Sequence, residues 1–204
     1  MYHREVTRAC PDVECPNALH LFLRALDLGE AVRLEYTGMA VLYPIRKYPD
    51  SVLRQKAQPI IEITDEVRKL ATDMIETMYA ASGVGLAANQ VGVALRLIVI
   101  DMGGEEGPNT VAVINPEIIE AVGEETAEEG CLSVPGFYEP VKRALHVTVK
   151  VTDLDGSERT VKCTGLAARA FQHEIDHLDG ILFIDHLSPL KKQLFRKEYL
   201  KQSK

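Results

Sequence analysis

The residues His173-Glu174-Ile175-Asp176-His177 form the most informative stretch of the chain, and they lie in a segment, about Leu166 to Leu178, that we expect to be a helix. Two imidazoles four residues apart share one face of a helix and can bind a single cation. Glu174 follows the first histidine, where its carboxylate can reach a water on that cation. Because the same motif also arises by chance in charged helices, other features of the sequence are needed to identify it as a metal site.

A third metal ligand has to come from elsewhere, because a catalytic divalent site usually has three protein ligands and one open position. The sequence offers Cys131 in the short segment Glu129-Gly130-Cys131-Leu132-Ser133. A lone cysteine is more often a small buried apolar residue than a ligand. Cys131 is therefore a candidate only together with the two histidines.

Outside these motifs, the spacing of apolar residues and the positions of turn and cap residues predict an α+β fold. We expect helices from Thr64 or Asp65 to Ser82-Gly83, from about 166 to 178 with Gly180 as the stop, and from about Pro189 to Lys201. Strands are predicted for Leu95–Ile100 and Val111–Ile114, with a hairpin joining Val147–Val151 to Thr160–Cys163 through Asp155-Gly156. Antiparallel strands set apart from a few helices are typical of α+β proteins rather than alternating α/β proteins.

The length of 204 residues suits one catalytic domain with an extension. We expect residues 1–40 to be an N-terminal extension, with a short helix near 17–29 and Met39 as an alternative start of the protein. The catalytic domain is expected at 41–188 and a basic C-terminal helix at 189–204.

The composition narrows the class of protein. A net charge of −7 disfavours nucleic acid as the main partner. No apolar run approaches the roughly 20 residues needed to span a bilayer, and no signal segment opens the chain, which together predict a soluble cytoplasmic protein. The four cysteines then act as thiols, and Cys10 and Cys15 match no standard zinc pattern.

Three segments together resemble the signature motifs of the peptide deformylase family. They are Gly83-Val84-Gly85-Leu86-Ala87-Ala88-Asn89-Gln90, Glu129-Gly130-Cys131-Leu132-Ser133 and Gln172-His173-Glu174-Ile175-Asp176-His177-Leu178. They occur in the order of the family, and the resemblance covers about Val41 to Ser188. The histidine motif is weak evidence alone, whereas the three together are highly specific.

The resemblance implies a fold, a metal and an activity. The fold is an α+β domain in which mixed or antiparallel sheets surround the HExxH helix. Cys131, His173 and His177 are implied as ligands of a metal that is usually Fe²⁺ in the cell, with Zn²⁺ or Ni²⁺ able to take the same site. The activity is hydrolytic removal of the formyl group from N-formyl-methionine at the start of nascent polypeptides, by metal-activated water.

The resemblance also implies roles for other residues. Glu174 accepts the proton of the attacking water and returns it to the new amine. The side-chain amide of Gln90 and the backbone N–H of Leu132 stabilise the oxyanion. Substrate runs as an added strand along Val84 and Gly85, with Gly130 as a further contact and the methionine in an apolar pocket.

We do not expect the remaining polar residues near the motifs to be metal ligands or catalytic groups. Gln172 and Asp176 are expected beside the site or on the helix surface rather than among the ligands. Arg143 could pair with a carboxylate near the site, although a solvated surface arginine is the commoner case. We interpret His146 and His186, which have no partner in any motif, as ordinary residues.

The C-terminal helix carries a basic stripe on an acidic protein. Such a stripe is usually a solvated face, but in an enzyme that meets chains at the ribosome exit it would suit a weak contact with RNA. Its members are Lys191, Lys192, Arg196, Lys197 and Lys201.

Two other functions fit parts of the pattern. A zinc endopeptidase would use the same HExxH motif but normally takes histidine or glutamate as its third ligand, which Cys131 argues against. A structural metal module would need a distant fourth ligand to close the coordination shell.

Overall fold

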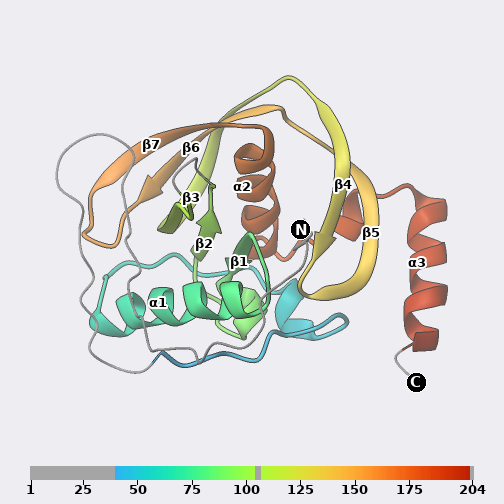
Figure 1. Cartoon of the computed structure of the whole chain (residues 1–204), viewed down its shortest axis with the longest axis horizontal. Coiled ribbons are helices and arrows are strands. Elements are labelled where there is room, and N and C mark those ends of the chain that lie inside the picture. Colours follow the sequence, from blue (N-terminus) through green and yellow to red (C-terminus); the bar gives the residue numbers. More distant parts are fainter. Residues whose placement is uncertain (1–39, 104–106, 203–204) are drawn as a thin grey trace, which may run out of the picture.

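The computed structural model describes residues 40–103 and 107–202 (Figure 1). The predicted extension and the predicted helix near 17–29 lie outside this part of the chain. The helices are α1 (Asp65–Ala80), α2 (Gly165–Leu178) and α3 (Pro189–Gln202), with short 3-10 turns η1 (Ser51–Arg54), η2 (Ala88–Val91) and η3 (Phe183–His186). The strands are β1 (Gly85–Ala87), β2 (Leu97–Asp101), β3 (Thr110–Val122), β4 (Glu125–Cys131), β5 (Val134–Arg143), β6 (His146–Thr152) and β7 (Glu158–Thr164).

The strands form two sheets. Five strands pair in the order β1-β2-β3-β6-β7, and β4 pairs with β5 in a separate hairpin. Every pairing between these strands is antiparallel. An isolated bridge from Gln58 to Leu95 is the one parallel contact in the described part of the chain. The predicted α+β class is confirmed, with antiparallel pairing throughout the two sheets.

Two helices pack on opposite sides of the five-stranded sheet, which explains the continuous apolar sequence of β2. Leu97 and Val99 join the core that contains α1, whereas Ile98 and Ile100 join the core that contains Phe171 of α2. Successive side chains of a strand point to opposite faces, so a strand covered on both faces must be apolar at every position.

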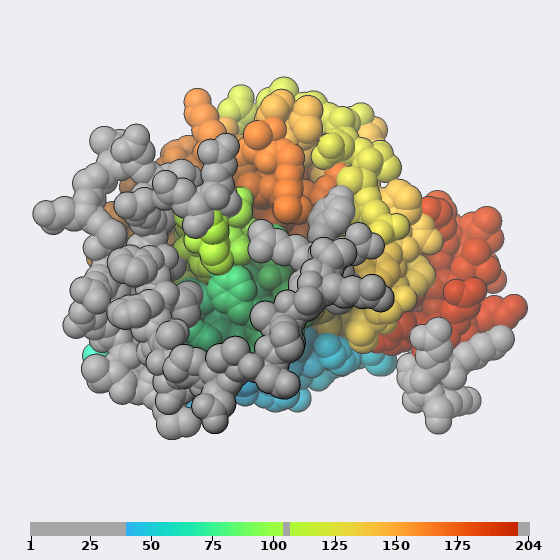
Figure 2. Space-filling view, in the orientation of Figure 1, coloured from blue at the N-terminus to red at the C-terminus, as the bar shows by residue number. Residues whose placement is uncertain are grey.

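A third core joins the β4–β5 hairpin to the C-terminal segments. It contains Cys131 and residues of β5, η3 and α3. Phe195 of α3 lies 4.7 Å from Phe137 of β5 and 5.3 Å from Tyr48, measured between ring centroids. In the space-filling view, α3 accordingly lies against the hairpin at one end of the molecule (Figure 2).

Most predicted elements are confirmed, and the differences have physical causes. The predicted helices correspond to α1, α2 and α3, and the predicted hairpin to β6 and β7. The strand predicted at Val111–Ile114 extends as β3 to Val122. Asn115 interrupts the apolar run with φ +50°, and its side chain bonds the backbone of Ile60 through both of its polar atoms, which bends the strand without ending it.

In the described residues, no helix has both the length and the apolar character that a membrane span requires.

Candidate metal centre

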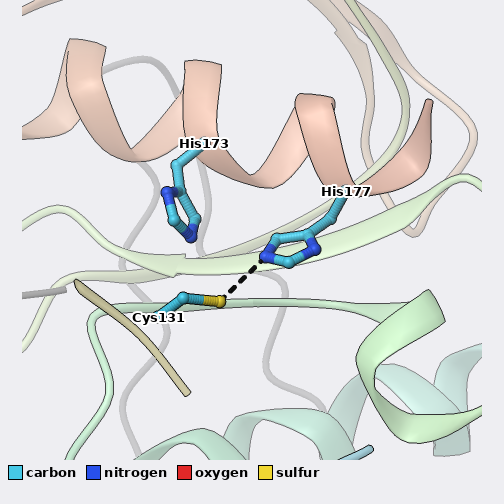
Figure 3. A group of neighbouring side chains, drawn as sticks. All are labelled: Cys131, His173 and His177. Carbon is cyan, nitrogen blue, oxygen red and sulfur yellow. Dashed lines mark hydrogen bonds between the residues drawn. The ribbon is translucent and has the colours of Figure 1, made fainter. Parts of the chain in front are cut away.

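Three buried side chains converge where helix α2 faces the tip of the β4–β5 hairpin (Figure 3). His173 and His177 point from α2 toward Cys131, the last residue of β4. One ligand atom from each lies within 4.8 Å of the others, and the Cys131 sulfur is 3.1 Å from Nε2 of His177. The described part of the chain offers no fourth histidine, cysteine or carboxylate to this group. Three protein ligands is the number usual in catalytic divalent sites.

The protonation chemistry of these groups fits a cation. Burial lowers the pKa of both histidines, which keeps the imidazoles neutral and able to bind metal. Burial, and next the carboxylate of Glu174, raise the pKa of the Cys131 thiol to about 12. A thiolate at this position therefore needs a nearby positive charge, which a divalent ion would supply. Within the described chain, Nε2 of His173 is buried without a hydrogen-bond partner, consistent with a position facing a metal.

Glu174 is the carboxylate beside this group. It is fully buried, and neither of its oxygens has a hydrogen-bond partner among the described residues. Burial raises its pKa to about 8. An unpaired carboxyl group that can gain or lose a proton near neutral pH is suited to general acid–base work.

Glu129 lies behind His173 and fixes the ring. Its Oε2 is 3.1 Å from Nδ1 of His173, while Arg143 donates to both of its oxygens at 3.0 and 3.1 Å and Arg169 to one at 2.7 Å. Burial by itself would raise the pKa of Glu129, but hydrogen bonds from His173 and Arg143 outweigh it and hold the pKa far below its usual range. The anionic carboxylate orients the imidazole so that Nε2 faces the cysteine.

Arg143 pairs with carboxylates near the site, which is one of the two alternatives that the sequence left open, and it is not a solvated surface arginine. Its side chain is only 5% exposed, and besides Glu129 it donates to Oδ2 of Asp176 at 2.5 Å. That oxygen also lies 2.7 Å from Nε2 of His186, a contact that no motif in the sequence indicated. As predicted, Asp176 stays outside the ligand group. These hydrogen bonds, and the one between Glu129 and His173, join residues that are 10 to 44 positions apart in the sequence. Local spacing therefore could not predict them.

Gln172 and Gln90 both serve the backbone. Gln172 exchanges hydrogen bonds with the N–H and carbonyl of Ala144 and so ties α2 to the end of β5. Oε1 of Gln90 accepts a hydrogen bond from the N–H of Ala87 at 2.8 Å, which directs its Nε2 to the hairpin tip, 3.1 Å from Oγ of Ser133 and 3.6 Å from the Cys131 sulfur. The Gln90 amide is thus fixed beside the ligand group.

A pocket of about 320 Å³, including its open mouth, adjoins the ligand group. Gly85 of β1 lies so close to Glu174 that a Cβ atom added there would be 2.5 Å from Oε1. Gly130 precedes Cys131 on β4 and does not line the pocket, whereas Leu132 occupies the turn that follows it. The lining residues are Val84, Gly85, Glu129, Leu166, Arg169, Ala170, His173 and Glu174.

Comparison with known proteins gives a consistent result. The family model described as Polypeptide deformylase matches residues 42–193. A peptide deformylase of Thermodesulfovibrio yellowstonii is 56% identical over 162 residues, which cover 79% of this chain and 98% of that protein.

Solved structures agree with this match. The crystal structure of a peptide deformylase from Legionella pneumophila has a TM-score of 0.75 at 46% sequence identity. The matched region covers 80% of this chain and 96% of the Legionella chain. A class I type b peptide deformylase from Acinetobacter baumannii, with Met-Ala-Ser bound, has a TM-score of 0.69 at 36% identity, covering 73% of this chain and 100% of its own.

Proposed function

The chain belongs to the polypeptide deformylase family, metal-dependent hydrolases that remove the N-formyl group from nascent polypeptides, and on that premise we propose how its residues perform the reaction. Cys131, His173 and His177 hold the metal, and Glu174 moves the proton. The observation that carries this assignment is the convergence of three buried ligand atoms within 4.8 Å, beside a carboxyl group whose oxygens have no partner in the described structure.

The donor set suits a divalent transition metal. A thiolate and two imidazoles favour Fe²⁺, Zn²⁺ or Ni²⁺ over Mg²⁺ or Ca²⁺, and we propose Fe²⁺ as the native ion with Zn²⁺ or Ni²⁺ as functional substitutes. When bound, such an ion supplies Lewis-acid polarisation of the formyl oxygen and lowers the pKa of water.

Glu174 carries the proton from the attacking water to the departing amine. Its raised pKa of about 8 means that the carboxyl group exchanges a proton readily near neutral pH. Because no hydrogen bond in the described structure occupies its oxygens, they are free to receive a substrate or water proton. Proton transfer by a positioned side chain typically contributes about 10²–10⁴-fold to the rate.

Gln90 and Leu132 stabilise the oxyanion. The bond from Ala87 to Oε1 of Gln90 holds the amide in one orientation, with its Nε2 toward the ligand group. The Leu132 N–H follows directly after the ligand Cys131 in the chain. Neutral donors fixed in advance cost little reorganisation, and loss of one typically lowers the rate by about 10²–10³-fold.

The substrate peptide adds to the edge of β1 that has no partner strand among the described residues. In that part of the chain, β1 is the last strand of its sheet and pairs only with β2. We propose that the peptide lies along Val84 and Gly85, with Gly130 on the opposite side, and that its methionine enters the pocket beside Leu166 and Ala170. Recognition through main-chain groups tolerates variety after the first side chain, which suits an enzyme acting on most nascent chains.

The decisive experiment compares Glu174→Ala with the wild-type enzyme on formyl-Met-Ala, using protein purified without oxygen. We expect the variant to retain its metal, because all three ligands remain, and to lose nearly all turnover. The exposed Glu158→Ala serves as the matched control and should behave as wild type. Full activity in Glu174→Ala would overturn the mechanism.

We further propose that the enzyme works in the cytoplasm and that α3 makes a weak contact with the ribosome. The helix carries Lys191, Lys192, Arg196 and Lys197 within seven residues of a chain whose net charge is −7. A local basic stripe on an acidic protein suits a weak contact with RNA.

A further inference from the structure

The turn that follows Cys131 is held from outside by an N-terminal segment. Cys131 and Val134 pair across the β4–β5 hairpin, so Leu132 and Ser133 form its two-residue tip. Nζ of Lys47 donates to the carbonyl of Leu132 at 2.5 Å, and the backbone N–H of Tyr48 donates to the carbonyl of Ser133 at 2.8 Å. The tip is therefore bound at both of its carbonyl groups.

The peptide group between Leu132 and Ser133 connects Lys47 to the sulfur. Its N–H, which belongs to Ser133, lies 3.4 Å from the Cys131 sulfur and donates to it. The carbonyl and N–H of a trans peptide point in opposite directions, so a group that holds the oxygen on one side directs the hydrogen to the other side.

The central peptide of a two-residue turn is the one that can rotate most easily. Turn types I and II differ chiefly in the orientation of this peptide, while the flanking residues stay nearly in place. The bond from Tyr48 fixes the next peptide, and Gln90 fixes the hydroxyl of Ser133. Lys47 is the group that restrains the central peptide itself.

We propose that Lys47 is a positioning residue for Cys131: its ammonium group holds the Leu132–Ser133 peptide so that the Ser133 N–H donates to the sulfur. The inference rests on the proposed ligation of the metal by Cys131. Hydrogen bonds to a ligating sulfur, and a positive charge near it, draw electron density from the thiolate and so tune the metal. The Lys47 ammonium and a Cys131 thiolate also attract each other directly.

The test uses the cobalt-substituted enzyme, in which a thiolate ligand gives a sulfur-to-cobalt charge-transfer band. Lys47→Met keeps the length of the side chain and removes its charge and donor. Because the sulfur then holds its electrons less tightly, we expect the band to move to lower energy. Lys47→Arg should restore most of the wild-type band energy. Lys150→Met, which removes a lysine paired with Glu158 away from the turn, should leave the band unchanged.

The amide proton of Ser133 gives a second readout in the zinc-substituted enzyme. Its resonance should move upfield in Lys47→Met and return in Lys47→Arg, which a general loss of stability would not produce. An unchanged band and an unchanged Ser133 resonance in Lys47→Met would overturn the role of Lys47 alone. Absence of a thiolate band in the wild-type cobalt enzyme would instead overturn ligation by Cys131, and this inference with it.

Discussion

At the scale of single residues, the position of Glu174 depends on a glycine, Gly85, beside it. Gly85 leaves the space that Glu174 fills, because an added Cβ would lie 2.5 Å from Oε1 and 3.0 Å from Cδ of that residue. Glu174 is fully buried and lines the same pocket as Gly85. Because Gly85 has no Cβ atom, the carboxyl group of Glu174 can occupy this position. This role is separate from the proposed contact of Gly85 with the substrate.

We therefore expect Gly85→Ala to displace the Glu174 carboxyl group and to lower kcat by about 10²-fold, the usual effect of a misplacement near 1 Å. Metal content should be unchanged, since no ligand is touched. The measurement is kcat and bound metal on the same preparation, with Glu158→Ala as control because Glu158 is exposed on β7 and does not line the pocket. Equal kcat values for Gly85→Ala and wild type would contradict the steric argument.

The raised pKa of Glu174 also predicts how stability depends on pH in metal-free protein. The pKa is about 8 in the folded state against an ordinary value of 4.5, so between these values the folded protein binds a proton that the unfolded chain does not. The stabilisation is complete below pH 4.5 and is lost as the pH rises through about 8.

Glutamine cannot titrate, so the free energy of unfolding of wild type should fall relative to that of Glu174→Gln between pH 5 and 8. The limiting slope is about 1.4 kcal/mol per pH unit. Urea unfolding of both metal-free proteins at several pH values measures this difference, and the effects of the histidines cancel because both proteins contain them. Parallel stability curves would show that Glu174 does not titrate in this range.

At the scale of secondary structure, regular periodicity made some elements predictable. The alternation of Val147, Val149 and Val151 predicts β6, and the histidine motif lies on the predicted helix α2. The β4–β5 hairpin was not predicted, because β4 begins Glu125-Thr126-Ala127-Glu128 and has little apolar alternation. The hairpin is held to the rest of the chain by residues far away in the sequence, such as Arg169, which donates to the carbonyls of Glu125 and Val141.

The candidate ligands could be chosen from sequence, but the network behind them could not. Spacing places His173 and His177 on one helix face, and the family motif adds Cys131. Glu129, in contrast, receives Arg143 from a neighbouring strand and Arg169 from helix α2. Only the folded chain brings these charges together, since their separations follow no helix or strand period.

The buried ion pairs that join β5 to β4 and α2 should contribute strongly to the free energy of unfolding. Arg143 joins Glu129 on β4 to Asp176 on α2, and its side chain is 5% exposed. Arg143→Met leaves buried carboxylates with fewer partners, and we expect a loss of about 3–5 kcal/mol in the free energy of unfolding.

The neighbouring lysine provides a matched control for this prediction. Lys142 pairs with Glu124 at the surface, where both side chains are more than half exposed. Lys142→Met should therefore cost less than about 1 kcal/mol. Urea unfolding of the metal-loaded proteins measures both changes, and similar values for the two variants would contradict the importance of the buried network.

At the scale of the whole molecule, the candidate metal centre lies between two cores. Phe171 of α2 belongs to the core beneath the five-stranded sheet, whereas Cys131 belongs to the core shared by the hairpin, η3 and α3. Phe183 of η3 stacks on His173 with 6.2 Å between ring centroids. Packing on both sides keeps the ligands away from water, which strengthens electrostatic interactions within the site. Docking of α3 through Phe195 adds to this enclosure and leaves basic residues of the helix exposed.

The exposed basic residues of α3 lead to a prediction about the ribosome. Arg196 and Lys197 are exposed, whereas Lys191 binds Glu139 and helps to dock the helix. We expect wild type to co-sediment with ribosomes at low salt and to dissociate as salt rises. The double variant Arg196→Gln/Lys197→Gln should bind more weakly and reduce the slope of log K against log salt by up to about 1.8, if each charge neutralises one phosphate. Its turnover of formyl-Met-Ala should be unchanged.

A variant that loses the same charge elsewhere separates this contact from a general charge effect. Lys150→Gln/Lys162→Gln changes two residues of β6 and β7, away from α3, and should bind ribosomes as wild type does. Because the whole chain carries a net charge of −7, repulsion from RNA opposes any attraction by α3. The contact must then be local as well as weak. Association that is insensitive to salt, or equal losses in the two double variants, would show that α3 does not bind ribosomal phosphate.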